Sequence, residues 1–320
     1  MEELARVYGQ TPEAIEKTLA QCREALLQVR GRRPRPHLDD KVLTDWNGLM
    51  IASLAQGARV LNAPKLYDAA KRAADFILNH MRTPDDCLLH RWRDGEGAIP
   101  GFLDDYAFFI HGLIDLYQAG FEVRYLSEAK ALTEKALALF GGPGGGPEGP
   151  LRFTAEGGEP MLYETQELYD GAVPSGNSVM LLSLLRLSRL LGDTSYEKRA
   201  EGIFQFFSEK MAQYPAGFSQ ALMALEYQIG PAREIVFAGT AQEIEPFLSR
   251  LRAHFIPNLV VLLNDPASHE TLKKISLFAA GKGKTGGPAA YICRNQVCGL
   301  PVTDPERFEK LLEDKPDVSA

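Results

Sequence analysis

The sequence feature that most constrains the fold is a repeat of paired helical segments, each pair an apolar segment followed by an amphipathic one. The three pairs are residues 46–61 with 65–81, 102–119 with 125–140, and 175–191 with 195–211. A segment that is apolar on nearly every side must be enclosed by other helices, whereas an amphipathic helix buries only one face. Repeated helical pairs stack on their neighbours and bury a shared core. The sequence therefore predicts a mainly α-helical fold of repeated helical hairpins, with apolar helices in an inner ring and amphipathic helices in an outer ring.

The connections between these segments differ in length. Those within a pair are short, whereas the connections from one pair to the next, such as 82–101, are long. All long connections therefore fall on the face where the inner helices begin, and a further helix over 215–229 closes the repeat. Long loops in compact domains are usually functional, so we expect the functional face to lie at the starts of the inner helices.

The two ends of the chain have a different character from the repeat. Residues 2–30 read as helix, with Thr11 as a cap and Pro12 in the first turn. After Gly230 the period changes to short apolar runs that alternate with helical segments, which is typical of a small parallel α/β unit. The expected strands are 234–239, 259–263 and 289–293, and the expected helices are 241–255, 268–280 and 304–313. We predict two domains, 1–230 and 231–320.

Composition narrows the class of partner. A net charge of −7 over 320 residues argues against nucleic acid or an anionic membrane as the main partner. No apolar run reaches the roughly 18–20 residues of a membrane span, and residues 1–4 lack the features of a secretory signal. The chain's four cysteines are too few and too scattered for a secreted disulfide framework. These observations favour a cytoplasmic protein.

Polar side chains gather at the expected starts of the inner helices. The candidate catalytic residues are Asp45, Asp104, Asp105 and Asp170. The candidate substrate-binding residues are His37, Asp40, Trp46, Asn47, Tyr106, Ser175 and Asn177. Aromatic rings stack on sugar faces, and carboxylates bind hydroxyls or act as acid and base, with glycoside cleavage needing two carboxyls about 5–9.5 Å apart. The alternative is that residues such as Asp45, Asp104 and Ser175 only cap helices.

Three further segments leave alternatives open. His111 lies seven residues after Asp104, on the same helical face, and is either a hydrogen-bonded core histidine or a proton shuttle deeper in the ring. His90 and Trp92 lie in the loop 82–101 and line its cleft, or Trp92 packs there as a lid. Cys293 and Cys298 are separated by four residues, which favours two structural thiols, with a disulfide or a shared metal as the alternatives.

Four motifs, in order along the chain, resemble one known family. They are 35–48, 101–107, 169–171 with 174–178, and 290–293 with Cys298. They look like the central motifs of the thioredoxin-domain proteins related to spermatogenesis-associated protein 20. The resemblance implies a thioredoxin-like domain followed by an α/α toroid of the six-hairpin glycosidase type, similar to those of N-acylglucosamine 2-epimerases and several glycoside hydrolases. We expect this chain to hold a partial α/α toroid followed by a small α/β domain, without the thioredoxin-like domain or the first hairpins.

Two functional hypotheses follow. The first is a carbohydrate-binding or carbohydrate-active module, epimerase-like or glycosidase-like, that takes a small-molecule or oligosaccharide ligand and uses the carboxylates at the inner-helix starts. The second is a non-catalytic scaffold for a redox domain, with an N-terminal thioredoxin-like polypeptide as the partner that completes the ring. Neither hypothesis calls for a cofactor, a metal, nucleic acid or a membrane.

Overall fold

The computed structural model describes residues 1–141, 149–155 and 166–313, in two compact units, Met1–Asp40 and Lys41–Ala320. The first unit contains α1 (Glu2–Tyr8) and α2 (Pro12–Gly31). The predicted helix is divided because α1 ends at Gly9, whose φ of 63° lies in the left-handed region. The predicted start of α2 is confirmed: the Thr11 side chain accepts a hydrogen bond from the Ala14 N–H at 3.2 Å.

The second unit begins with the repeat of helical hairpins. The pairs are α3 (Thr44–Leu61) with α4 (Pro64–His80), α5 (Leu103–Gly120) with α6 (Val123–Phe140), and α7 (Gly176–Leu191) with α8 (Thr194–Gln213), followed by η1 (Pro215–Gly217) and α9 (Ser219–Ile229). The first helix of each pair ends at a residue in the left-handed region, namely Asn62 (φ 49°), Phe121 (φ 57°) and Gly192 (φ 75°). In each case the backbone N–H of that residue closes the helix on a carbonyl four residues earlier. The hairpins therefore repeat the same turn although its residue type differs each time.

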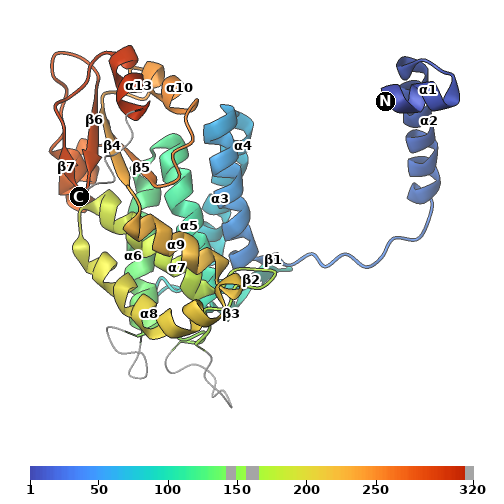
Figure 1. The fold of residues 1–320 in the computed structure, drawn as a ribbon. Helices are drawn as coiled ribbons and strands as arrows, with labels where there is room; N and C mark the ends of the chain where they lie inside the picture. The colour runs from blue at the N-terminus through green and yellow to red at the C-terminus, as the bar shows by residue number, and fades with distance from the viewer. Residues whose placement is uncertain (142–148, 156–165, 314–320) are drawn as a thin grey trace. The chain divides into compact units, whose positions relative to one another are not determined.

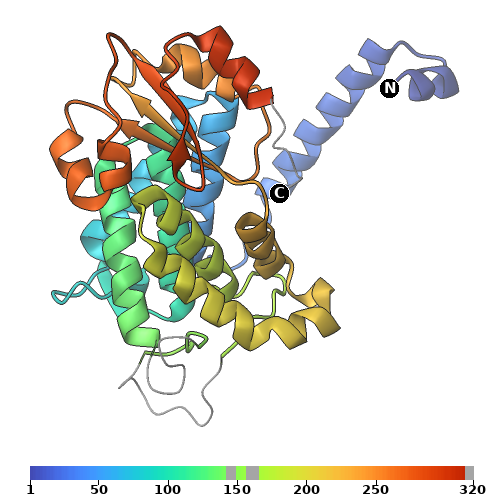
Figure 2. The ribbon, with the colours of Figure 1, turned by 60° about the vertical axis from the view of Figure 1, so that its left-hand side comes forward.

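The first helices of the pairs form the inner layer. Helix α5 packs between α3 and α7, and α4, α6 and α8 lie on the outer side (Figures 1 and 2). Most residues of α5 and α7 are buried, which confirms a mainly helical partial α/α toroid of inner and outer helices. Helices α3 and α5 approach closely at Gly48, where an added Cβ would lie 2.4 Å from the carbonyl carbon of Phe108. This contact fixes the start of α3 beside the start of α5.

The expectation that the first apolar helix is enclosed on every side is wrong. Trp46, Met50, Val60 and Leu61 of α3 are 62%, 57%, 60% and 70% exposed. The reason lies in its neighbours, since α3 packs on α4, α5, β1 and β2 and these leave one apolar face of the helix uncovered.

The loop 82–101 contains strands that the sequence analysis did not predict. A three-stranded antiparallel sheet forms from β1 (Val42–Leu43), β2 (Leu89–Arg93) and β3 (Glu96–Pro100). A two-residue turn joins β2 to β3, with Asp94 (φ 53°) and Gly95 (φ 82°) both in the left-handed region. Asp-Gly is a favoured sequence for such a turn.

Residues after Ile229 form a small α/β unit. Its elements are β4 (Arg233–Ala238), α10 (Glu245–Leu251), β5 (Leu259–Asn264), α11 (His269–Ile275), α12 (Leu277–Ala280), β6 (Ala289–Arg294), β7 (Val297–Cys298) and α13 (Pro305–Glu313). The strand order is β5-β4-β6-β7, with β4 and β5 parallel. The prediction of a parallel sheet is wrong for β6, which pairs antiparallel with β4. The short helices α11 and α12 do not carry the chain back across the sheet, so β6 runs in the opposite direction.

The sheet packs onto the helices. Val236, Val260 and Leu262 share one hydrophobic core with α5 and α7, and Figure 1 shows β4–β7 at one end of the helices and β1–β3 at the other. Cys293 and Cys298, paired across β6 and β7, form a disulfide, so the favoured reading of two free structural thiols is wrong. The division into domains at residue 230 stays a prediction. Within the described ranges, no helix combines the length and the apolar character needed to cross a bilayer.

Candidate functional site

The site lies where α3 and α5 begin, and its centre is the fully buried carboxylate of Asp105. One oxygen accepts the backbone N–H of Asp45 at 3.1 Å, and the other accepts the N–H of Phe102 at 2.8 Å. The His90 Nδ1 atom, on β2, lies 3.0 Å from both oxygens. Asp105 therefore connects the starts of the two inner helices to β2.

His90, Asp45 and Asp105 offer ligand atoms within 4.8 Å of one another, so a metal centre has to be considered. The hydrogen bond to Asp105 and the nearby carboxylate charges raise the pKa of His90, although burial opposes them. The Nδ1 atom donates its N–H to Asp105 and therefore has no lone pair left for a metal. Both Asp105 oxygens already accept hydrogen bonds. The arrangement fits a hydrogen-bonded, charge-assisted cluster better than a metal centre.

Asp104 lies next to this cluster and lines a separate cavity of about 230 Å³. The cavity also contains Glu167, Tyr169 and the start of α7 at Gly176. Burial, together with the charges of the neighbouring carboxylates Asp105, Asp45 and Glu167, raises the pKa of Asp104 to about 6, although a hydrogen bond from the Gly176 backbone opposes the rise. Asp104 therefore changes protonation close to neutral pH, which suits a general acid or base.

Asp45 has a smaller role in this geometry than Asp104. Its Oδ1 accepts the N–H of the next residue, Trp46, at 2.7 Å. Burial and the charge of Asp105 raise the pKa of the Asp45 carboxyl, against the opposing hydrogen bond from Trp46 and the charge of His90. Asp45 is therefore a second carboxyl in the same cluster.

Several predicted site residues hold the backbone in place. Asp170 accepts N–H groups from Ser175 at 3.0 Å and from Gln220 and Ala221, at the start of α9, at 2.8 and 3.2 Å. The Ser175 hydroxyl caps α7 by accepting the Ser178 N–H at 3.1 Å. The alternative that Ser175 caps a helix therefore agrees with its contacts.

Three other predicted residues also bind backbone groups. Asn177 is buried and uses its whole amide on the main chain of Leu151 and Glu167. The buried Tyr106 hydroxyl accepts the Leu88 N–H at 2.8 Å. The Asn47 amide donates to the Leu43 carbonyl at 2.7 Å. These side chains hold the backbone around the site, and they have few groups left for a ligand.

The remaining predicted binding residues are exposed. Trp46 projects from the uncovered face of α3. His37 and Asp40 lie in the first unit, where their side chains are exposed. Glu167 and the central position of His90 were missed. The sequence signal for His90 is its spacing of two residues from Trp92, which places both side chains on one face of a strand. No sequence signal marks Glu167 as a site residue.

The chain is homologous to a class of larger proteins along nearly its whole length. It is 33% identical over 325 residues to human spermatogenesis-associated protein 20, covering 98% of this chain and 41% of that protein. The rat protein of the same name is 34% identical over 317 residues, covering 95% of this chain and 40% of that protein. An uncharacterized protein of Caenorhabditis elegans is 29% identical over 321 residues, covering 97% and 43%. The chain therefore spans about two fifths of the length of these relatives, and no protein-family model matches it.

Solved structures with a similar arrangement include two glycoside hydrolases. A GH76 α-mannanase of Bacteroides thetaiotaomicron aligns with a TM-score of 0.46 and 14% identity, covering 61% of this chain and 55% of that one. A family 105 glycoside hydrolase of C. acetobutylicum ATCC 824 aligns with a TM-score of 0.41 and 13% identity, covering 63% and 60%.

Proposed function

We propose that the starts of α3, α5 and α7 form a carbohydrate site in which Asp104 gives or accepts a proton. The observation that carries the proposal is the position of Asp104 in the 230 Å³ cavity with a pKa raised to about 6. A carboxyl in that state is available as acid and as base near neutral pH, which is what acid–base chemistry at a sugar requires.

The other groups around the cavity suit a small polar ring. Tyr169 is 50% exposed and lines the cavity, so its ring is available to stack on a pyranose face. Glu167 and the backbone of α7 add hydrogen-bonding groups for hydroxyls. The cavity is below the roughly 300 Å³ at which sites for drug-sized ligands begin, so we expect it to hold a single sugar unit.

Asp104 would act on the ring or on the glycosidic oxygen, with a neighbouring carboxylate as the complementary base. In its protonated form Asp104 would donate to a leaving oxygen, and in its ionised form it would accept a proton from an activated carbon or a water. Both hydrolysis and ring-opening epimerisation have this requirement. The proposed class is therefore a carbohydrate-active module with acid–base chemistry.

The test is a calorimetric titration of the chain with N-acyl hexosamines, glucose and short glucans, paired with a turnover assay. The variant Asp104→Asn should keep binding and lose about 10²–10⁴ in rate, and the pH profile should change near pH 6. Asp68→Asn, the same substitution at an exposed position of α4, should leave both unchanged. Binding heat that is absent for every sugar would end the proposal.

The uncovered face of α3 favours a second function, support of a partner polypeptide. Trp46, Met50 and Val60 form an apolar stripe along one side of the helix, and such faces usually mark interfaces. We propose a thioredoxin-like polypeptide as the occupant. Met50→Lys should abolish its co-purification with this chain without lowering stability, since Met50 is exposed. An unchanged complex would count against it.

A further inference from the structure

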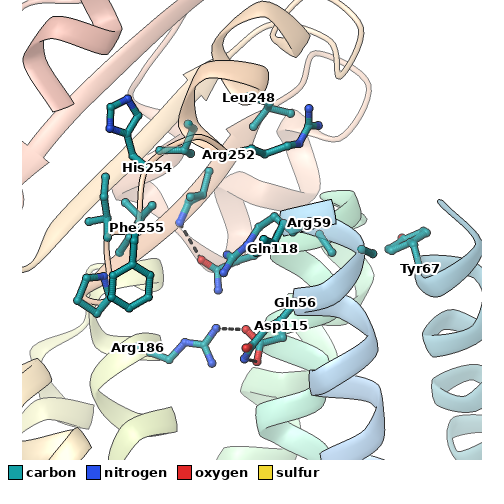
Figure 3. Close-up of a pocket in the computed structure, with 18 of the residues that line it drawn as sticks. Gln56, Arg59, Tyr67, Asp115, Gln118, Arg186, Leu248, Arg252, His254 and Phe255 are labelled. Atoms are coloured by element: carbon teal, nitrogen blue, oxygen red, sulfur yellow. Dashed lines mark hydrogen bonds and ion pairs between the residues drawn. The ribbon is translucent and has the colours of Figure 1, made fainter. Parts of the chain in front are cut away.

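A cavity of about 720 Å³ is lined by residues from the last turns of the inner helices α3 and α5, whereas Asp104 lies at the start of α5. Figure 3 shows residues that line this cavity. Its walls come from the last turns of α3 and α5, from α7 and α9, and from the segment between α10 and β5. Asp104 and Asp115 are eleven residues apart on α5, so the two cavities are separated by roughly 16 Å along one helix. The volume is within the roughly 300–1,000 Å³ of small-molecule sites.

Among the residues that line this cavity, Asp115 and Arg186 form an ion pair. Asp115 bonds to Arg186 at 2.5 Å and accepts from the Gln56 amide at 2.9 Å. Burial alone would raise the pKa of Asp115, but the charge and the hydrogen bond of Arg186 outweigh burial and lower the pKa to about 2. Burial lowers the pKa of His111 to about 4, so this imidazole is neutral at pH 7. Asp115 and Arg186 therefore balance each other.

One positive charge in the lining remains unbalanced. Arg252 pairs with Glu245 at 2.6 Å. Arg59 makes no hydrogen bond or close ion pair among the described residues, and the carboxylate whose charge acts on it is the more distant Asp115. Asp115 is the single carboxylate among the described residues that line the cavity, and Arg186 already neutralises it. The cavity therefore carries an excess positive charge at Arg59.

Two buried side chains among the residues that line the cavity carry a hydrogen-bonding group without a partner in the described chain. Gln118 is 1% exposed, and its carbonyl oxygen accepts the Val261 N–H at 2.8 Å, which leaves its Nε2 group without a partner among the described residues. Tyr227 is 3% exposed, and its hydroxyl likewise has no partner in the described chain. An unsatisfied buried polar group costs about 1–3 kcal/mol, and such groups are rare in folded proteins. The Gln118 Nε2 group can only donate, and the Tyr227 hydroxyl can donate as well as accept, so a partner that accepts hydrogen bonds would satisfy both.

We propose that this cavity binds a small organic anion. Its carboxylate or phosphate oxygens accept hydrogen bonds from Gln118 and Tyr227 and pair with the guanidinium of Arg59. Its apolar part covers Met223 and Phe255, which line the cavity and are 59% and 92% exposed. A cation would meet the charge of Arg59 unfavourably, and a neutral polyol would leave that charge unpaired. A ligand with an oxyanion on an apolar body would pair with Arg59, accept from the two donors and cover the apolar side chains.

The experiment is a calorimetric titration of the full chain with phenyl phosphate, phenylacetate and the neutral phenylacetamide. At least one anion should bind saturably and at least tenfold more tightly than the amide, and the tighter of the two anions identifies the group. Arg59→Gln should weaken that binding tenfold or more. Arg72→Gln removes the same charge from an exposed position of α4 and should leave the affinity for the anion unchanged.

A second variant separates a binding role from a structural one. Tyr227→Phe removes a hydroxyl that has no partner in the described structure, so it should weaken anion binding several-fold without lowering the unfolding temperature. Anions that bind no better than phenylacetamide would overturn the proposal. Unchanged affinity in Arg59→Gln, or in Tyr227→Phe if the first variant does not fold, would also overturn it.

Discussion

Replacement of Asp104 by Asn should stabilise this protein at pH 7 and above. Asp104 is held in a site that raises its pKa to about 6, mainly by burial and then by the charges of Asp105, Asp45 and Glu167. Ionisation of Asp104 in the folded chain is therefore unfavourable. The amide introduced by Asp104→Asn would fill the same space and keep an oxygen to accept the Gly176 N–H, but it would carry no charge.

The magnitude follows from the proton linkage. The difference between a pKa of about 6 in the folded chain and the ordinary value of 3.8 corresponds to roughly 3 kcal/mol, and partial exposure of the side chain reduces this to about 2 kcal/mol. Between these pKa values the folded state holds a proton that the unfolded state has released. The stability of the wild-type protein therefore falls as pH rises from about 4 to about 6, whereas the contribution of this position is constant in Asp104→Asn.

The assay is urea unfolding of both proteins at a series of pH values from 4 to 8. The difference in unfolding free energy should grow by about 2 kcal/mol in favour of Asp104→Asn across that range. Asp170→Asn is the matched control, because Asp170 accepts three backbone N–H groups and its replacement should cost about 1–3 kcal/mol at pH 7. A difference for Asp104→Asn that does not vary with pH would refute the reasoning.

Two further substitutions test the packing of α5. Asp115→Asn should destabilise the protein by about 3–5 kcal/mol at pH 7, because it leaves Arg186 buried without its counter-charge. In the wild type the stabilisation by ionised Asp115 is fully present above pH 4, and it is lost as pH falls toward 2, since the pKa of Asp115 in the folded chain is about 2. Urea unfolding measures the loss of stability in the variant and the pH dependence of the wild type. Gly48→Ala should lower the unfolding temperature sharply, because the new Cβ would lie 2.4 Å from the backbone of Phe108. Gly31→Ala, with nothing within 4 Å, should have little effect, and equal effects of the two would contradict the close approach.

The helices were predictable because their signals are local. The alternation of apolar and amphipathic segments marks each hairpin, and Thr11 and Ser175 mark helix starts through caps that the structure confirms. The hairpin β2–β3 also had a local signal in Asp94-Gly95 that the sequence analysis did not use. The direction of β6 had none, because it depends on a pairing with β4 about fifty residues earlier.

The site was predictable as a region but not residue by residue. Helices α3 and α5 run in the same direction, so their polar starts meet, as Asp45 and Asp105 do. Neighbouring positions on a helix point about 100° apart, and the sequence does not reveal how far α5 is rotated about its axis. Asp105 consequently became a buried hydrogen-bond acceptor while Asp104 lines the cavity. The large cavity at the other end had no sequence pattern, since its unused donors come from α3, α5 and α9 and meet only in the folded chain.

The two cavities place carboxylates with oppositely shifted pKa values on the same buried helix, α5. At its start, burial and then the charges of neighbouring carboxylates raise the pKa of Asp104 to about 6. At its other end Asp115 is fully ionised because Arg186 is close. Between the two ends α5 is packed on both sides by α3 and α7, and a close-packed interior has little freedom to deform. A ligand at one end would therefore meet a rigid helix, so we expect binding of an anion near Arg59 to leave the pKa of Asp104 unchanged. A pH profile of the Asp104 site that is displaced by saturating phenyl phosphate would contradict this expectation.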